Sequence, residues 1–110
     1  MNNLGIAKAI AELEGVNVDL YNGELCLFEK DGVLGPEVPV GYFNPITDLA
    51  LNCMLRDKYG VCVSYADFKY ICVDDATQKV GYTEFESKED IPRAVCECIL
   101  KSQGRYLNEQ

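Results

Sequence analysis

The chain has 110 residues, of which 48% are hydrophobic and 25% charged, and this is the composition of a single globular domain. Its 18 acidic and 10 basic residues leave a net charge of −8, which disfavours direct binding to the phosphates of nucleic acids. No apolar run approaches the roughly 20 residues that a membrane-spanning helix needs, and the first residues lack the ending of a cleaved signal peptide. We therefore expect one cytoplasmic domain over residues 1–110, with a frayed tail at 105–110.

The first predicted elements are a helix and a β-hairpin. The helix runs over Asn3–Glu14 and ends at Gly15, with Asn2 or Asn3 as its cap. Alternating polar and apolar residues over 16–20 and 25–29 predict two strands, and Asn22-Gly23 between them favours a tight turn because both residues accept positive φ. The side chains expected to face inward are Ile6, Ala9, Ile10 and Leu13 of the helix, and Val16, Val18, Leu20, Leu25 and Leu27 of the strands.

Residues 31–44 form a predicted loop rich in glycine and proline. Long ordered loops are often functional, because binding residues concentrate on them. A contact surface here would include Tyr42, Phe43 and Asn44. The alternative interpretation is a packed connector.

Residues 42–60, YFNPITDLALNCMLRDKYG, carry the clearest helix signals, and we expect the rest of the chain to pack around this helix. Asn44 is the predicted cap, Pro45 falls at the first helical position, and Gly60 ends the helix. Asp48 suits the positive N-terminal end. Contact with a ligand is the alternative role for these polar residues. The helical spacing predicts a buried face of Ile46, Leu49, Ala50, Cys53 and Met54, widened by Leu51 and Leu55, with Asn52 outside it.

The second half of the chain predicts three strands and a helix. The strands cover residues 61–65, 68–73 and 80–85, and their short links favour an antiparallel meander with 68–73 in the centre. A final helix covers 91–103, with Asp90 as its cap. The fold class is therefore α+β, with three amphipathic helices packed on one mostly antiparallel sheet in an α-β-α sandwich.

The six cysteines do not form a metal-binding pattern. They have no CxxC spacing, and the chain contains no histidine, so a structural zinc site is not expected. Most of them alternate with Val, Ile and Leu, where cysteine behaves as a small apolar residue, and cytosolic thiols stay reduced. We expect core-filling thiols and no cofactor. The six are Cys26, Cys53, Cys62, Cys72, Cys96 and Cys98.

Three stretches of the chain resemble the NinX-like small proteins of tailed phages and prophages, and the related phage ABA-sandwich domain. These stretches are GIAKAIAELEG, YFNPITDLALNCMLRDKYGV and IPRAVCECILKSQG. Such proteins often carry a tryptophan after the central helix, and here Phe68 or Tyr70 takes that place. The resemblance implies a phage accessory protein with an α-β-α sandwich and no established catalytic residues.

The sequence does not predict an enzyme. Hydrolytic chemistry usually needs a base, and histidine, the commonest one, is absent. Neither Ser64 nor Ser87 lies in a GxSxG motif, and no phosphate-binding glycine loop is present. The paired acids Asp74 and Asp75 are typical of a polar turn.

The leading hypothesis is a protein–protein interaction module that binds and inhibits a host protein, such as a component of an anti-phage defence system. An acidic surface suits a basic partner, for example one with a nucleic-acid-binding groove. Homodimerisation through a strand edge is compatible with this role. The candidate partner-binding residues are Tyr42, Phe43, Asn44, Asp48, Tyr65, Asp67, Asp74 and Asp75.

The alternative is a protein that binds a small molecule, such as a sponge for a nucleotide signal. Phosphates need arginine or lysine, so the few cations would have to converge beside Tyr42 or Tyr65. Those cations are Arg56, Lys58, Lys69, Arg93 and Arg105.

Overall fold

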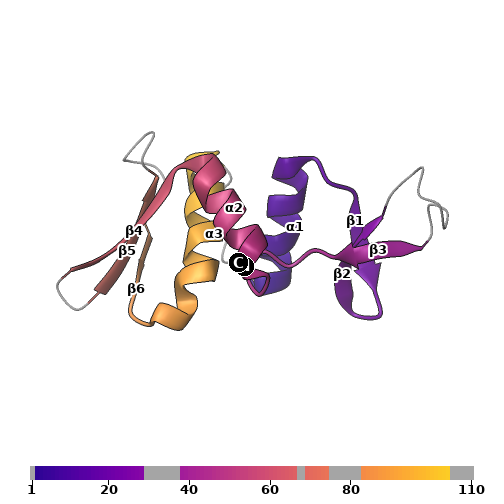
Figure 1. The fold of residues 1–110 in the computed structure, drawn as a ribbon, viewed down its shortest axis with the longest axis horizontal. Helices are drawn as coiled ribbons and strands as arrows, with labels where there is room; N and C mark the ends of the chain where they lie inside the picture. Colours follow the sequence, from indigo (N-terminus) through magenta and orange to yellow (C-terminus); the bar gives the residue numbers. More distant parts are fainter. Residues whose placement is uncertain (1, 29–37, 67–68, 75–82, 105–110) are drawn as a thin grey trace.

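The computed structural model describes residues 2–28, 38–66, 69–74 and 83–104 (Figure 1). Within these ranges the chain has an α+β fold, as predicted. The helices are α1 (Asn3–Glu14), α2 (Leu49–Tyr59), the short 3-10 helix η1 (Lys88–Asp90) and α3 (Ile91–Ser102). The strands are β1 (Val18–Tyr21), β2 (Glu24–Phe28), β3 (Pro39–Tyr42), β4 (Val61–Ala66), β5 (Lys69–Asp74) and β6 (Thr83–Phe85).

The described strands form two antiparallel sheets, in the orders β1-β2-β3 and β4-β5-β6. Figure 1 shows the two sheets at opposite ends of the molecule, with α1, α2 and α3 between them. The single sheet expected from the sequence is therefore wrong for the described residues. The central position of β5 and the antiparallel meander were predicted correctly.

Strand β3 completes the first sheet. Its residues Pro39 and Gly41 lie in the predicted loop, and both residue types are rare inside strands. Pairing of β3 with β2 gives the hairpin a third strand, which leaves β1 and β3 as the edges of a complete small sheet. An edge strand tolerates proline because one side of it forms no ladder.

The N-terminal helix and the hairpin turn follow the sequence signals closely. The Asn2 side chain accepts a hydrogen bond from the Gly5 N–H at 2.8 Å, and Gly15 ends α1 with φ 70°. Asn22 and Gly23 form the turn between β1 and β2 with φ of 53° and 81°. The inward face of the first strand is only partly confirmed: Val18 packs on the core, whereas Leu20 is exposed on β1 and Val16 is exposed in the connection before it.

Helix α3, rather than α2, occupies the centre of the fold. It packs against α1 and α2 and against every strand of the second sheet. The helical spacing predicts a buried face of Ile91, Ala94, Val95, Cys98 and Ile99; Ile91 is only partly buried, and because neighbours surround the helix, burial extends to Cys96 and Leu100. Asp90 precedes the helix as predicted, but its side chain forms no capping hydrogen bond.

All six cysteines lie in the described part of the chain, and no disulfide joins them there. Cys26, Cys72, Cys96 and Cys98 are buried, which confirms four of the six core predictions. Burial raises the pKa of the Cys72 thiol to about 11 and that of Cys96 to about 12, so both stay protonated at neutral pH. The core prediction is wrong for Cys53 and Cys62, which are exposed because the faces that carry them point away from α3.

Candidate functional site

Helix α2 begins later than its sequence signals indicate. The Asn44 side chain accepts hydrogen bonds from the Ile46 and Thr47 N–H groups at 3.2 and 3.3 Å, which closes a turn before the helix. Asp48 is the actual cap, and its carboxylate accepts from the Leu51 N–H at 3.2 Å. The prediction of Asn44 as the helix cap is therefore wrong, because a turn closed by Asn44 precedes the helix.

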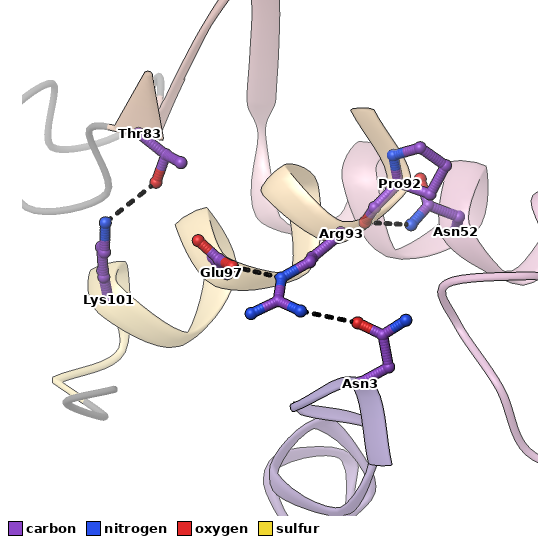
Figure 2. A network of polar contacts seen from close by, with 7 residues as sticks. All are labelled: Asn3, Asn52, Thr83, Pro92, Arg93, Glu97 and Lys101. Carbon is purple, nitrogen blue, oxygen red and sulfur yellow. Dashed lines mark hydrogen bonds and ion pairs between the residues drawn. The ribbon is translucent and has the colours of Figure 1, made fainter. Parts of the chain in front are cut away.

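The side of α2 that faces α3 carries an asparagine. Asn52 is only 5% exposed. Its Nδ2 donates to the carbonyl oxygens of Pro45 at 2.8 Å and Pro92 at 2.9 Å, and the second of these bonds is drawn in Figure 2. It also lies 3.7 Å from the Cys96 Sγ. With the fully buried Leu55, Asn52 joins α2 to the start of α3.

Because Asn52 and Leu55 face the core, the side of α2 that carries Leu49 and Met54 faces solvent. Leu49 is 64% exposed and Met54 is 52% exposed, and Ala50 and Cys53 are exposed between them. Cys53 follows Leu49 by four positions and Met54 follows Ala50 by four, so the four residues lie on one side of the helix; we call them the α2 face. The predicted buried face is therefore wrong for these four residues, whereas Leu55 is fully buried and Ile46 and Leu51 pack partly buried against the core, as predicted.

Several polar contacts hold the C-terminal end of α2 in place. The Lys58 Nζ lies 2.9 Å from the Glu14 Oε2 of α1, and the Tyr59 hydroxyl donates to the same carboxylate. Burial raises the pKa of the Glu14 carboxyl, but the hydrogen bonds from Tyr59 and Lys58 outweigh this effect and hold the pKa below its ordinary value. Burial and the Glu14 carboxylate raise the pKa of Tyr59 to about 12. The α2 face is thus presented on an anchored helix.

The cations proposed for a phosphate site have protein partners. The Arg56 Nε donates to the Val61 carbonyl oxygen at 3.2 Å, and Lys58 pairs with Glu14. Figure 2 shows Arg93 between the Glu97 carboxylate at 2.7 Å and the Asn3 side chain at 2.8 Å. The same figure shows Lys101 donating to Thr83 at 3.1 Å, which joins α3 to β6. Arg105 and the Lys69 side chain lie outside the described part of the chain.

The predicted partner-binding aromatics do not form one surface. Tyr42 is 68% exposed on β3, whereas Tyr65 is 58% exposed on β4, where its ring packs 4.7 Å from that of Tyr70. Strands β3 and β4 belong to the sheets at opposite ends of the molecule (Figure 1). Phe43 is only 4% exposed and belongs to the core, so its assignment to a binding surface is wrong.

The predicted polar site residues have mixed outcomes. The Asn44 side chain is half-buried, and its Oδ1 closes the turn before α2. Asp48 is exposed at the start of α2, next to the α2 face. Asp67 and Asp75 lie outside the described residues, and Asp74 is described only as the last residue of β5.

A hollow on the first sheet was not predicted. It has a volume of about 330 Å³ and is lined by the exposed side chains of Tyr21, Glu24, Val40 and Tyr42. The alternation of Val40 and Tyr42 was a usable sequence signal, but Pro39 and Gly41 obscured the strand. Sequence reasoning also missed Asn52, because nothing local distinguishes it from an exposed asparagine.

Within the described ranges, no cluster of three or more histidine, cysteine, aspartate or glutamate side chains is arranged to hold a metal ion. The described helices are too short or too polar to cross a membrane. Comparison with protein-family models, curated proteins and solved structures finds no match to this chain. The resemblance to NinX-like proteins therefore stays an interpretation of the three sequence motifs.

Proposed function

We propose that this protein is a protein-binding module and that the α2 face contacts its partner. The observation that carries the proposal is the exposure of Leu49 and Met54, 64% and 52%, on one side of an anchored helix. Grouped apolar side chains on a surface are typical of interaction sites, and an amphipathic helix that docks in an apolar groove is a recurring form of recognition.

The orientation of α2 about its own axis also supports this proposal. A half-turn about the helix axis would bury Leu49 and Met54 but would expose Asn52 and Leu55, which are buried in the observed orientation. The observed orientation instead buries Leu55, satisfies Asn52 with two carbonyl oxygens and leaves Leu49 and Met54 uncovered. Full burial of a leucine or methionine contributes about 1.5–3 kcal/mol, and a bound partner would recover this contribution.

The partner that we propose is a host protein, and inhibition of a defence component is the proposed outcome. The net charge of −8 supports a partner with a basic surface around its apolar groove. The phage origin on which the inhibition rests is supported by the resemblance of the three motifs to NinX-like proteins.

The test is affinity capture from host lysate with matched surface variants. The first variant combines Leu49→Ser with Met54→Ser on the α2 face. The control combines Val16→Ser with Leu20→Ser, two exposed apolar residues near the first sheet. In urea unfolding, both variants should keep the unfolding free energy of the wild type to within about 0.5 kcal/mol, because the four side chains are exposed.

We expect wild type and control to retain the same protein in stoichiometric amount, and the α2 variant to lose it. Equal retention by all three proteins would contradict the role of the α2 face. A homodimer of the wild type that dissociates in the α2 variant would also contradict binding to a different protein, because the two α2 faces would cover each other.

A further inference from the structure

The outer face of the first sheet carries a second feature, which the α2 face does not explain. Tyr21 pairs with Glu24 across β1 and β2, and Cys26 pairs with Tyr42 across β2 and β3. Residues paired across a ladder share a face, and so do residues two apart on one strand. Tyr21, Glu24, Cys26, Val40 and Tyr42 therefore lie on one side of the sheet. Together they line the hollow of about 330 Å³, which we call the tyrosine hollow.

The chemistry of the tyrosine hollow is aromatic and acidic. Tyr21 and Tyr42 are exposed, whereas Cys26 is buried beneath them. The Glu24 side chain is exposed, and its carboxylate forms no hydrogen bond or ion pair with the described residues. The other described residues that line the hollow are Asn22, Pro39, Val40 and Gly41, so no described lining residue carries a positive charge.

We propose that the tyrosine hollow binds an arginine side chain of the partner protein. A planar guanidinium stacks on the face of an aromatic ring and donates two parallel hydrogen bonds to a carboxylate. Two tyrosines beside Glu24 supply both kinds of contact within one hollow. Arginine fits better than lysine, because an ammonium has neither the plane nor the fork.

Charge complementarity selects this occupant over a second copy of the chain. The protein carries a net charge of −8, and a second copy would bring another acidic surface against Glu24. This inference rests on the proposed protein-binding function and adds one chemical requirement, an arginine on the surface of the partner. The tyrosine hollow lies on the first sheet and is separate from the α2 face. In Figure 1, α1 lies between the first sheet and α3.

A titration with short peptides tests the inference directly. The amide spectrum of the ¹⁵N-labelled full chain is followed during addition of tetra-arginine or tetra-lysine at low ionic strength. We expect tetra-arginine to shift the resonances of Tyr21, Glu24 and Tyr42 in a saturable way. Tetra-lysine should bind at least about threefold more weakly, because it lacks the stacking plane.

Three variants separate a specific site from general attraction. Glu24→Gln and Tyr42→Leu should each weaken tetra-arginine binding about fivefold, since each removes one contact of the guanidinium. Asp57→Asn is the matched control, because it changes the net charge by the same amount at an exposed position on α2. It should change the dissociation constant by less than about twofold, as expected for a distant, screened charge.

Equal weakening by Glu24→Gln and Asp57→Asn would overturn the proposal, because binding would then follow net charge. Equal binding of the two peptides would overturn the assignment to arginine. If Tyr42→Leu shifts amide resonances far from position 42 before any peptide is added, the variant is misfolded, and Tyr21→Leu is tested in its place. The variant that combines Leu49→Ser with Met54→Ser should bind tetra-arginine with the affinity of the wild type. The peptide titration and the lysate capture therefore test different surfaces, and a negative result in one does not decide the other.

Discussion

Replacement of Asn52 by alanine should destabilise the protein more than any other single truncation on α2 except that of Leu55. The Asn52 Nδ2 donates to the carbonyl oxygens of Pro45 and Pro92 at 2.8 and 2.9 Å, in a site that is 5% exposed. Each lost hydrogen bond removes about 1 kcal/mol, and the Pro45 carbonyl, left without the Asn52 donor, costs about 1–3 kcal/mol more, whereas the Pro92 carbonyl keeps its place in the α3 ladder. Partial access of water to the new space reduces that sum. We expect a loss of about 2–4 kcal/mol.

The assay is urea unfolding of wild type, Asn52→Ala and Met54→Ala. A loss of this size lowers the urea midpoint of a small domain by about 1–2 M. Met54 is the matched control on the same helix, because it is 52% exposed and its truncation should cost less than about 0.5 kcal/mol. The helical spacing in the sequence predicts the reverse order for these two residues. A larger loss for Met54→Ala than for Asn52→Ala would refute the orientation of α2.

Asn52→Asp adds a pH signature to this test. A carboxylate at this site would face two carbonyl oxygens without a donor, so the pKa of the new acid should be higher in the folded state than in the unfolded state. The folded state then binds more protons, and the variant should lose stability as the pH rises through the unfolded pKa. Equal destabilisation of Asn52→Asp and Asn52→Ala at all pH values would contradict the buried contacts with Pro45 and Pro92.

Three further predictions concern ionisable groups. The pKa of Glu14 is lowered in the fold, so its stabilising contribution is present above the unfolded pKa and is lost as the pH falls through the folded pKa; Glu14→Gln should flatten the acid limb of the urea midpoint against pH. The pKa of Tyr59 is raised to about 12, so its contribution is present below the ordinary value of about 10 and is lost towards 12. Tyr59→Phe should remove a step near pH 12 from a spectrophotometric titration of the phenols, and an unchanged titration would contradict the bond to Glu14. A thiol reagent should modify Cys53 and Cys62 rapidly in the native protein and the four other thiols only on unfolding, whereas six equally slow thiols would contradict the exposed side of α2.

Local signals in the sequence were sufficient for the elements at both ends of the chain. Asn2 and Gly15 bound α1, and Asn22-Gly23 sets the hairpin turn, because capping and positive φ depend on neighbouring residues only. The final helix was predicted to begin at Ile91, as observed.

The orientation of α2 depends on contacts that sequence patterns do not contain. Helical spacing indicates which residues share a side, but it does not indicate which side meets the core. In this protein the decision involves Asn52 and the carbonyl of Pro92, which lies 40 residues away in the chain. A polar residue that is satisfied by a distant backbone group is indistinguishable, in the sequence, from one on the surface.

The division of the strands into two sheets was also beyond local reasoning. Strand β3 contains Pro39 and Gly41, and its identity depends on pairing with β2 across residues 29–38. Because β3 carries Val40 and Tyr42, half of the lining of the tyrosine hollow depends on this strand. The position of Tyr42 on the same side of the sheet as Tyr21 was therefore not predictable. The exposure of Tyr42 was predicted, whereas the burial of Phe43 follows from its place in the core cluster.

Site-specific photo-cross-linking at position 54 tests the role of the α2 face most directly. A photoreactive phenylalanine replaces Met54 in one protein and Lys8, an exposed residue of α1, in the control. After irradiation in host cells, we predict that the probe at position 54 forms one adduct with a single host protein and that the probe at position 8 forms none. No adduct at position 54, or adducts only between copies of this chain, would contradict the account.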